Sequence, residues 1–195
     1  AMKPSQIAAF TDTQIPLLSD DQIGALTAAQ VKALLPAQLT AMAPEKLGVI
    51  STKAMSGFDA TQLAGLNATQ TAGFKETQLA ALTAAQVAGF GADDITGFSA
   101  DQVAAISSKA ISGLSTTAIG ALVDTQVAEM KAAQIAALKA DQVAALAITT
   151  ISSLTTDQIS LMNAAQIGAL TDSQLAELLD TQIAAISSKA VTGLK

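Results

Sequence analysis

An eight-residue period runs through the whole chain and constrains its fold more than any other feature. Counted from Lys3, residues 3 to 194 divide into 24 octads without an insertion or deletion, and all seventeen glutamines fall at position 4 of an octad. Position 8 is Leu, Ile, Met or Phe throughout, and position 5 is a large apolar residue in every octad but one, which has Thr71. So strict a period is typical of repeat arrays, in which neighbouring copies of a small unit complete one another's core.

The first four positions of the octad resemble a helix N-terminal capping box. A hydroxyl at position 1 can accept the backbone N–H of position 4, and the Gln side chain at position 4 can accept the N–H of position 1. We expect the full pair in seven octads: Thr11 with Gln14, Ser19 with Gln22, Thr27 with Gln30, Thr83 with Gln86, Ser99 with Gln102, Thr155 with Gln158 and Thr171 with Gln174. The pattern is not universal, because Leu35, Ala43, Val123, Ala147 and Leu179 occupy position 1 without a side-chain acceptor.

One continuous helix is excluded, because at about 100° per residue an eight-residue repeat would rotate its apolar stripe by roughly 80° per copy. We therefore predict an all-α fold, an α-solenoid or superhelical array of about 24 very short helices, one per octad. Each helix is expected to hold about seven residues and to depend on packing for its stability. Pro16 lies inside its predicted helix and should distort it.

Positions 5 and 8 are predicted to line a narrow continuous core. The candidate core residues singled out at position 8 are Phe10, Leu26, Phe58, Phe74, Phe90, Phe98, Leu122, Leu138 and Leu170. Position 7 is Ala or Gly in eighteen octads, and seven of these are Gly. Two interpretations of the glycines stay open: a neighbouring backbone approaches there, or Gly helps to end the helix.

Uniform periodicity predicts a single elongated repeat domain over residues 3–194. Residues 1–2 (Ala-Met) are interpreted as a cloning scar, and Lys195 as the start of a further octad, so the chain is expected to be an excerpt of a longer array. Its open terminal cores are candidates for end-to-end self-association. No run approaches the roughly 18 apolar residues of a membrane span, so no membrane insertion is expected.

The composition argues against most site chemistry. The chain has no His, Cys, Trp, Tyr or Arg, which removes the main side chains for general acid–base catalysis, zinc binding and bidentate phosphate recognition. We predict no enzyme activity, no cofactor and no metal. The pairs Asp20-Asp21 and Asp93-Asp94 could suggest a cation site, but compensation of the helix dipole in the first turn is the favoured explanation. A net charge of -6 and the absence of Arg argue against nucleic-acid binding.

Three octads, residues 51–58, 107–114 and 187–194, share Ala in place of Gln and a Lys in the first turn. Lys53, Lys109 and Lys189 are either contacts for a partner or marks of a variant unit inherited by duplication, and duplication is the favoured reading.

Tandem octads such as Leu82-Thr-Ala-Ala-Gln-Val-Ala-Gly-Phe90 and Leu170-Thr-Asp-Ser-Gln-Leu-Ala-Glu-Leu178 resemble the Thr-x-x-Gln-Ile-x-x-Leu repeats of very large bacterial surface proteins. These are often labelled adhesion or haem-utilisation proteins. The resemblance covers the whole chain and implies a secreted or cell-surface location and a stalk or spacer role. It carries over no functional residues, and without His or Cys the haem label finds no axial ligand here.

The leading functional hypothesis is a non-enzymatic structural module that projects or connects other domains of the same long chain. A protein-binding scaffold, with an unknown protein as partner on one solenoid face, is the alternative. Ice or mineral binding through Thr61, Thr69 and Thr77 is the remote alternative.

Overall fold

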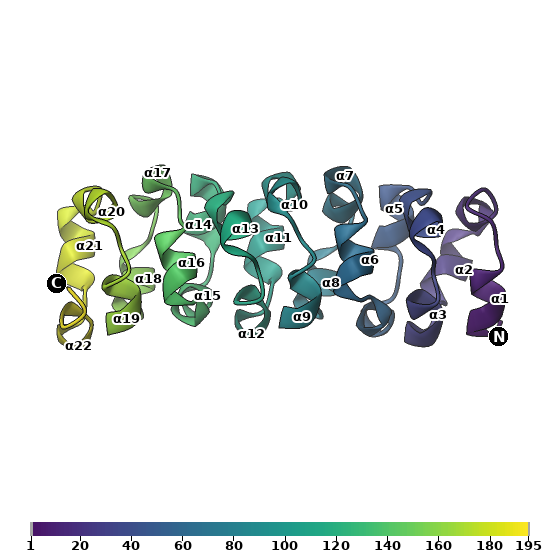
Figure 1. The fold of residues 1–195 in the computed structure, drawn as a ribbon, viewed down its shortest axis with the longest axis horizontal. Coiled ribbons are helices and arrows are strands. Elements are labelled where there is room, and N and C mark those ends of the chain that lie inside the picture. Colours follow the sequence, from purple (N-terminus) through teal and green to yellow (C-terminus); the bar gives the residue numbers. More distant parts are fainter. Residues whose placement is uncertain (1, 195) are drawn as a thin grey trace.

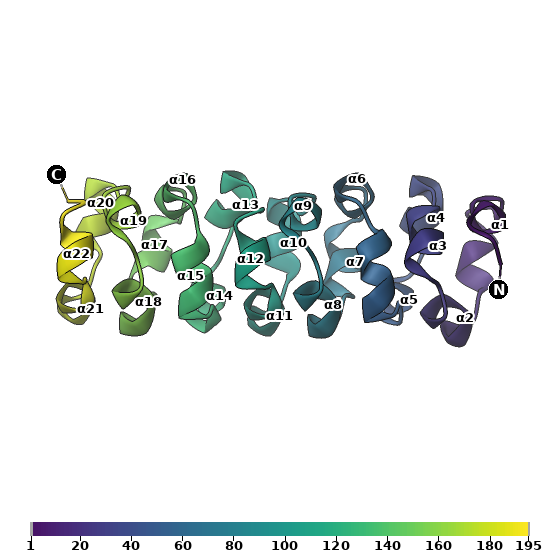
Figure 2. The same cartoon turned by 90° about the horizontal axis from the view of Figure 1, so that it is seen from below.

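The computed structural model describes residues 2–194 as an elongated array of short helices, which runs from one end of the molecule to the other (Figures 1 and 2). Within these residues every octad contains one helical segment, and there are 22 α-helices, two 3₁₀ helices and no strand. The predicted α-solenoid with one helix per octad is confirmed. Ala1 of the expected scar and Lys195, the expected start of another octad, lie outside the described residues.

The helical segments follow one another without a long linker. In chain order they are α1 (Pro4–Ala8), η1 (Ile15–Leu17), α2 (Asp20–Gly24), α3 (Ala28–Lys32), α4 (Pro36–Thr40), α5 (Pro44–Gly48), η2 (Thr52–Gly57), α6 (Ala60–Ala64), α7 (Ala68–Ala72), α8 (Glu76–Ala80), α9 (Ala84–Val87), α10 (Ala92–Gly97), α11 (Ala100–Ala105), α12 (Ser108–Ile111), α13 (Thr116–Gly120), α14 (Asp124–Glu129), α15 (Ala132–Ala137), α16 (Ala140–Ala144), α17 (Ile148–Ile151), α18 (Thr156–Ser160), α19 (Ala164–Ile167), α20 (Asp172–Ala176), α21 (Asp180–Ala185) and α22 (Ser188–Val191).

The α-helices are four to six residues long, shorter than the predicted seven. The reason is visible at the junctions, where two successive residues leave the helical region. Between α10 and α11, for example, Phe98 has φ −74°, ψ 142° and Ser99 has φ −66°, ψ 162°. Both are extended, so positions 8 and 1 together turn the chain, and a helix has only the positions between them.

Pro16 has the predicted effect on its octad. Residues Ile15–Leu17 form the 3₁₀ helix η1 instead of an α-helix, because a proline this far into a helix removes one backbone donor and crowds the preceding turn. The 3₁₀ helix η2 over Thr52–Gly57 was not predicted.

Successive turns of the superhelix stack through helices that are three octads apart in sequence. α7 packs on α10, α10 on α13 and α13 on α16, and the same offset of three octads recurs along the array. Side-chain hydrogen bonds of the glutamines reach 28 to 31 residues back along the chain. One superhelical turn therefore takes between three and four octads, a number that the sequence analysis left open.

Positions 5 and 8 form one continuous core along the axis. Position 5 is at most 1% exposed from Ile7 to Ile167, and Leu122, Leu138 and Leu170 at position 8 are also buried. Phe58 and Phe74 meet edge to face at 5.9 Å between ring centroids, as do Phe90 and Phe98 at 5.2 Å.

Of the predicted core residues, Leu26, Phe58, Phe74, Phe90, Phe98, Leu122, Leu138 and Leu170 are buried. Phe10 differs, because it is only partly buried against the core. It lies in the first turn of the superhelix, where no earlier turn of the described chain covers it.

The position-7 glycines mark close approaches between backbones. A Cβ built on Gly113 would lie 2.0 Å from the carbonyl oxygen of Ala84, and one on Gly57 would lie 2.1 Å from that of Ala28. No described glycine has a positive φ, so none ends its helix through the left-handed conformation. Of the two interpretations left open, close approach accounts for most of these glycines. Gly65 is an exception, since its nearest contacts would be 3.5 Å away.

No described helix combines the length and apolar character needed to cross a membrane.

Candidate functional site

The most regular arrangement of polar groups in the molecule is built by the glutamines at position 4. All seven predicted capping pairs make both hydrogen bonds: the position-1 hydroxyl accepts the N–H of the Gln, and the Gln Oε1 accepts the N–H of position 1. Where position 1 is Leu35, Val123 or Leu179, the Gln Oε1 still accepts that residue's N–H at 2.7–3.0 Å. Half of the capping box thus survives without a side-chain acceptor at position 1.

The same glutamines have a second role that the sequence analysis did not predict. Gln134 is representative: its Nε2 donates to the carbonyl oxygens of Ile106 at 2.7 Å and Val103 at 2.9 Å, both in the preceding turn of the superhelix. Its Oε1 meanwhile caps the N–H of Lys131 at 2.7 Å. One amide therefore starts its own helix and joins two turns.

This double role is shared by fourteen glutamines, which we call the glutamine ladder: Gln30, Gln38, Gln62, Gln70, Gln78, Gln86, Gln102, Gln126, Gln134, Gln142, Gln158, Gln166, Gln174 and Gln182. Each donates at 2.5–2.9 Å to the carbonyl 28 residues earlier, which is at position 8 for all but Gln30. That carbonyl lies past the end of a helix and would otherwise lack a donor.

One signal in the sequence could have revealed the ladder. A capping box accepts Glu as readily as Gln, yet position 4 never holds Glu in 24 octads. Glutamate could accept the cap N–H but, when ionised, could not donate to a carbonyl.

Gln6, Gln14 and Gln22 in the first turn cap their own helices but lie exposed. Among residues 2–194 their Nε2 groups have no hydrogen-bond acceptor, because no earlier turn lies beside them. Gln30 is the first buried glutamine, and its Nε2 donates to the carbonyl of Met2 at 2.7 Å.

Lys46 replaces the glutamine of its octad and takes over its inter-turn bond. Its Nζ donates to the carbonyl of Leu18, 28 residues earlier, at 2.7 Å, and to Asp20 Oδ1 at 2.7 Å. This is the one ion pair found within residues 2–194. Asp20, half of an acidic pair considered as a cation site, is thus a partner of Lys46.

Asp94 and Thr71 are two departures from the consensus that bind each other. Asp94 stands where Gln is expected, Thr71 is the one polar residue at position 5, and the Thr71 hydroxyl donates to Asp94 Oδ1 at 2.8 Å. Asp94 Oδ2 accepts the N–H of Gly91 at 2.8 Å. Thr71 is 0% and Asp94 7% exposed. Asp94 therefore caps α10 as a glutamine would, but its second oxygen accepts a bond from a hydroxyl instead of donating one to a carbonyl.

The acidic pairs do not gather into a metal centre. No group of three or more Asp or Glu side chains in the described part of the chain could hold an ion. Both Asp94 oxygens already accept hydrogen bonds, and Asp93 and Asp94 lie in the first turn of α10, where negative charge is favoured.

The three octads that combine Ala at position 4 with a Lys in the first turn lack the amide that would bond to the preceding turn. Ala54, Ala110 and Ala190 are buried, while Lys53, Lys109 and Lys189 beside them are exposed and form no ion pair within residues 2–194. A hollow of about 440 Å³ lies next to Ala190 and is lined by Leu161, Met162, Asn163, Ser187 and Lys189 among others.

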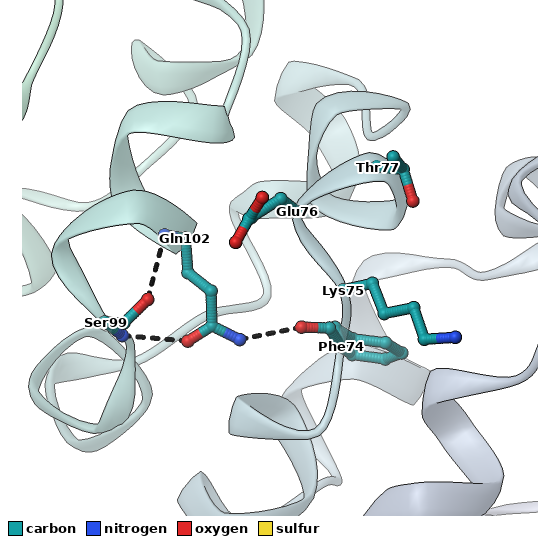
Figure 3. A pocket seen from close by; sticks show the side chains of 6 residues that line it. All are labelled: Phe74, Lys75, Glu76, Thr77, Ser99 and Gln102. Carbon is teal, nitrogen blue, oxygen red and sulfur yellow. Dashed lines mark hydrogen bonds between the residues drawn. The ribbon is translucent and has the colours of Figure 1, made fainter.

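Another hollow, of about 470 Å³, lies between α8 and α11 and is lined by Phe74, Lys75, Glu76, Thr77, Ser99 and Gln102 (Figure 3). Gln102 spans it, with its Oε1 on the N–H of Ser99 at 2.8 Å and its Nε2 on the carbonyl of Phe74 at 2.7 Å. Lys75 and Glu76 point to opposite sides (Figure 3). The side chains of Gln102 and Ser99 are both engaged in hydrogen bonds with backbone groups.

Comparison with known proteins gives no assignment: no protein-family model matches the chain, and no curated protein matches it. The arrangement of residues is suited to holding turns of backbone at a fixed separation.

Proposed function

We propose that this protein is a non-enzymatic structural module that acts as a stalk or spacer segment and holds other parts of a longer chain apart. The observation that carries the proposal is the glutamine ladder combined with the packing of helices three octads apart. Together they connect every turn to the next by buried hydrogen bonds and apolar contacts. Because the same connection is repeated, the number of octads sets the distance between the two ends.

The proposed setting is a large bacterial surface or secreted protein, and it rests on the resemblance of the octads to Thr-x-x-Gln-Ile-x-x-Leu repeats. Other domains of the same chain are the proposed partners, with end-to-end self-association of the array as a further mode. A catalytic role is not proposed, because the abundant Ser and Thr side chains at position 1 are used as helix caps.

The spacer role can be tested by measuring distance within one molecule. The chain has no cysteine, so Ala29→Cys and Ser173→Cys give two unique labelling sites. Both residues are exposed and occupy position 3 of their octads. These sites are about five turns apart, and spin labels should give one narrow distance near 40–50 Å if packed helices lie 8–10 Å apart. A broad distribution, as for a flexible chain, would refute a spacer of fixed length.

A protein-binding scaffold remains the second candidate, favoured by one observation. Large apolar side chains lie on the surface at octad positions other than the core positions 5 and 8. Leu161, at position 7, is 55% exposed and borders the hollow beside Ala190, and Ile148, at position 2, is 48% exposed. Exposed apolar groups of this kind can serve as contacts for a protein partner. Saturable capture of one partner by the isolated array, abolished by Leu161→Ser, would favour this reading over the spacer.

Ice or mineral binding through Thr61, Thr69 and Thr77 is the remote candidate. All three side chains are exposed, but consecutive octads lie about a quarter turn or more apart around the axis, so these hydroxyls face different directions. Thermal hysteresis in a dilute solution of the chain would be needed to revive this hypothesis.

A further inference from the structure

The superhelix separates lysines and carboxylates onto two sides of the array. The helices α3, α9, α12, α15, α19 and α22 lie along the lower edge of Figure 1, and α3, α12, α15 and α22 lie in front in Figure 2, which is seen from below. η2 stacks on α3. We call the octads of these seven helical segments the lysine side, because they hold neither Asp nor Glu but five lysines: Lys32, Lys53, Lys109, Lys131 and Lys189. All five are exposed and form no ion pair within residues 2–194.

The three variant octads with Ala at position 4 and a Lys in the first turn all belong to the lysine side, although they are unevenly spaced in the sequence. Seven octads separate Lys53 from Lys109, and ten separate Lys109 from Lys189. Because one turn takes between three and four octads, these steps are about two and about three turns. The uneven spacing therefore brings the three lysines to one side, which inheritance by duplication alone does not require.

The opposite side of the array is acidic. The helices α5, α7, α10, α14, α17 and α20 lie toward the upper edge of Figure 1. We call their octads the acidic side, because they hold seven Asp or Glu residues and one lysine, Lys46, which is paired with Asp20. Six of these carboxylates are exposed: Glu45, Asp93, Asp124, Glu129, Asp172 and Glu177.

Two exposed apolar residues lie among the carboxylates of the acidic side. Val123, the N-cap of α14, is 46% exposed, and Ile148, the first residue of α17, is 48% exposed. The two helices pack on each other. A lysine stem can cover apolar surface while its ammonium group reaches a charged partner. The acidic side therefore offers a lysine both a carboxylate and an apolar contact.

From this separation of charge we propose that a second copy of this chain binds side by side, with the lysine side of one copy against the acidic side of the other. Both sides follow the same superhelix, so their charges recur with the same rise per turn, about 8–10 Å if packed helices set it. The match holds over any number of turns. Single exposed ion pairs are weak, and a row of them gains affinity through its number.

A second copy suits the lysine side better than a polyanion does. The net charge of the chain is -6, which repels an approaching polyanion over the whole molecule. A second copy has the same net charge, but its carboxylates are spaced like the lysines that they would meet, and its apolar residues add a contact that charge does not provide.

The side-by-side contact runs along the length of the array. Since the two surfaces differ, the contact is heterologous and each copy keeps one free side, so association is open-ended. Any stretch of several turns carries both sides, so the same contact would hold neighbouring stalks together. The proposal goes beyond the spacer function and depends on surface charge, not on the fixed length of one array.

Sedimentation velocity at low and high salt tests the proposal. At about 10 mM salt, where charges act over about 30 Å, the 195-residue chain should form oligomers that grow with protein concentration. At about 1 M salt this range shrinks to about 3 Å, and the chain should be monomeric. The triple variant Lys53→Gln, Lys109→Gln and Lys131→Gln removes three charges of the lysine side, and association at low salt should weaken about tenfold or more.

The matched control is the triple variant Ala37→Asp, Thr61→Asp and Thr117→Asp. These residues are exposed in the first turns of α4, α6 and α13, which belong to neither side. Both triple variants lower the net charge by three from -6, so general repulsion between copies rises equally. The control should therefore associate about tenfold more tightly than the Lys→Gln variant.

Two charge-reversed variants supply the decisive arm. One carries Lys53→Glu, Lys109→Glu and Lys131→Glu, and the other carries Glu45→Lys, Glu129→Lys and Glu177→Lys. Each alone sets like charges against each other and should be monomeric at low salt. In a 1:1 mixture the reversed side of one variant meets the oppositely reversed side of the other, so oligomers should form again. Circular dichroism confirms that each variant is folded. If a reversed variant does not fold, the Lys→Gln variant and its control decide the question.

The proposal is overturned if the unmodified chain stays monomeric at low salt, if the Lys→Gln variant associates as tightly as its control, or if the mixture of folded reversed variants stays monomeric. A monomeric chain that binds polyphosphate, lost in the Lys→Gln variant, would give the lysine side to a polyanion instead. The spin-label distance of the spacer experiment can be measured in the Lys→Gln variant at high salt. Failure of side-by-side binding and failure of the spacer role are therefore distinguishable.

Discussion

At the scale of single residues, the side-chain amide at position 4 explains why this array uses glutamine so strictly. Oε1 accepts the N–H of position 1 and Nε2 donates to a carbonyl one turn earlier, as Gln134 does with Lys131 and Ile106. Only an amide of this length offers both an acceptor and a donor without a charge. Lys46 keeps only the donor role and Asp94 only the cap, and each has acquired a new partner, Asp20 or Thr71.

Gln134→Glu tests this explanation. The carboxylate keeps the cap on Lys131 but faces the carbonyls of Val103 and Ile106 in a buried site. The free energy of unfolding should fall by about 2–5 kcal/mol at neutral pH. Gln14→Glu is the control, because Gln14 is exposed and its Nε2 has no acceptor in the described chain; it should cost less than about 0.5 kcal/mol. Urea unfolding of both variants measures the difference.

The loss in Gln134→Glu should also depend on pH. Burial beside carbonyls disfavours the charged form, so the pKa of the new carboxyl is higher in the folded than in the unfolded chain. The folded state then binds more protons, and its stability relative to the unmodified chain rises as pH falls through that pKa. A deficit that stays constant between pH 7 and pH 4 would contradict a role for the Nε2 donor, since protonated Glu regains a donor.

The Thr71–Asp94 pair makes a second prediction for single residues. Thr71→Val alone leaves a buried Asp94 oxygen without its 2.8 Å donor, and should cost about 1–3 kcal/mol. In the double variant with Asp94→Gln, the consensus amide can reach the carbonyl of Leu66, and the cost of Thr71→Val should largely disappear. A double-mutant cycle in urea should therefore give a coupling of about 1–3 kcal/mol. Additive effects would show that the two departures are unrelated.

At the scale of helical elements, the spacing between stacked helices is limited by backbone contact at position 7. Gly113, just after α12, and Gly65, at the end of α6, occupy this same position. A Cβ on Gly113 would lie 2.0 Å from a carbonyl oxygen of α9, whereas one on Gly65 would have no contact under 3.5 Å. The same residue type at the same position thus has opposite consequences, which depend on the neighbouring turn.

Gly113→Ala and Gly65→Ala should therefore change stability in opposite directions. Gly65→Ala lowers the backbone entropy of the unfolded chain without a clash and should stabilise by about 0.4–1 kcal/mol. Gly113→Ala must push α9 and α12 apart and should destabilise by about 1–3 kcal/mol. Thermal unfolding of the two variants beside the unmodified chain gives the sign of each effect. Stabilisation by Gly113→Ala would mean that the turns are not in backbone contact there.

The helices show which features of the fold could be predicted from the sequence of a single octad and which could not. Helix starts and the apolar core could be predicted, because the cap pair of Thr83 and Gln86 and the apolar residues Val87 and Phe90 are local signals that repeat. The ends of the helices could not be predicted as well, since two extended residues such as Phe98 and Ser99 form each junction. Their dihedral angles set the turn between helices, and no side-chain pattern in the octad specifies them.

The inter-turn bonds were missed for a related reason. Gln134 and Ile106 are 28 residues apart, and which carbonyl a glutamine reaches depends on how many octads make one turn. Thr71, an exception at position 5, and Asp94, half of an acidic pair, likewise had no visible connection in the sequence, because only the superhelix brings residues 23 apart into contact. At the candidate site, the hydrogen bond from the position-1 N–H to the Gln Oε1 was therefore predictable, and the bond from the Gln Nε2 to the preceding turn was not.

At the scale of the whole molecule, every hydrogen bond from the glutamines ends within 31 residues of its donor, and the packed helices are three octads apart. Stability should then be a sum of local terms, each spanning about one turn, and not a property of one global core. An insertion or deletion should therefore affect stability only when it shifts the octads before it out of the eight-residue phase of the octads after it.

Two deletions of different length separate phase from length. Removing residues 131–138, one whole octad, keeps Gln142 and Leu146 in phase with the turn below, so unfolding in urea should remain one transition with little loss of stability. Removing residues 131–134, half an octad, places positions 4 and 8 out of phase across the cut and breaks one turn of the ladder. The two blocks should then unfold independently, which circular dichroism would record as two transitions or one much broader transition. Equal behaviour of the two deletions would show that the eight-residue phase does not hold the turns together, and the ladder would lose its structural role.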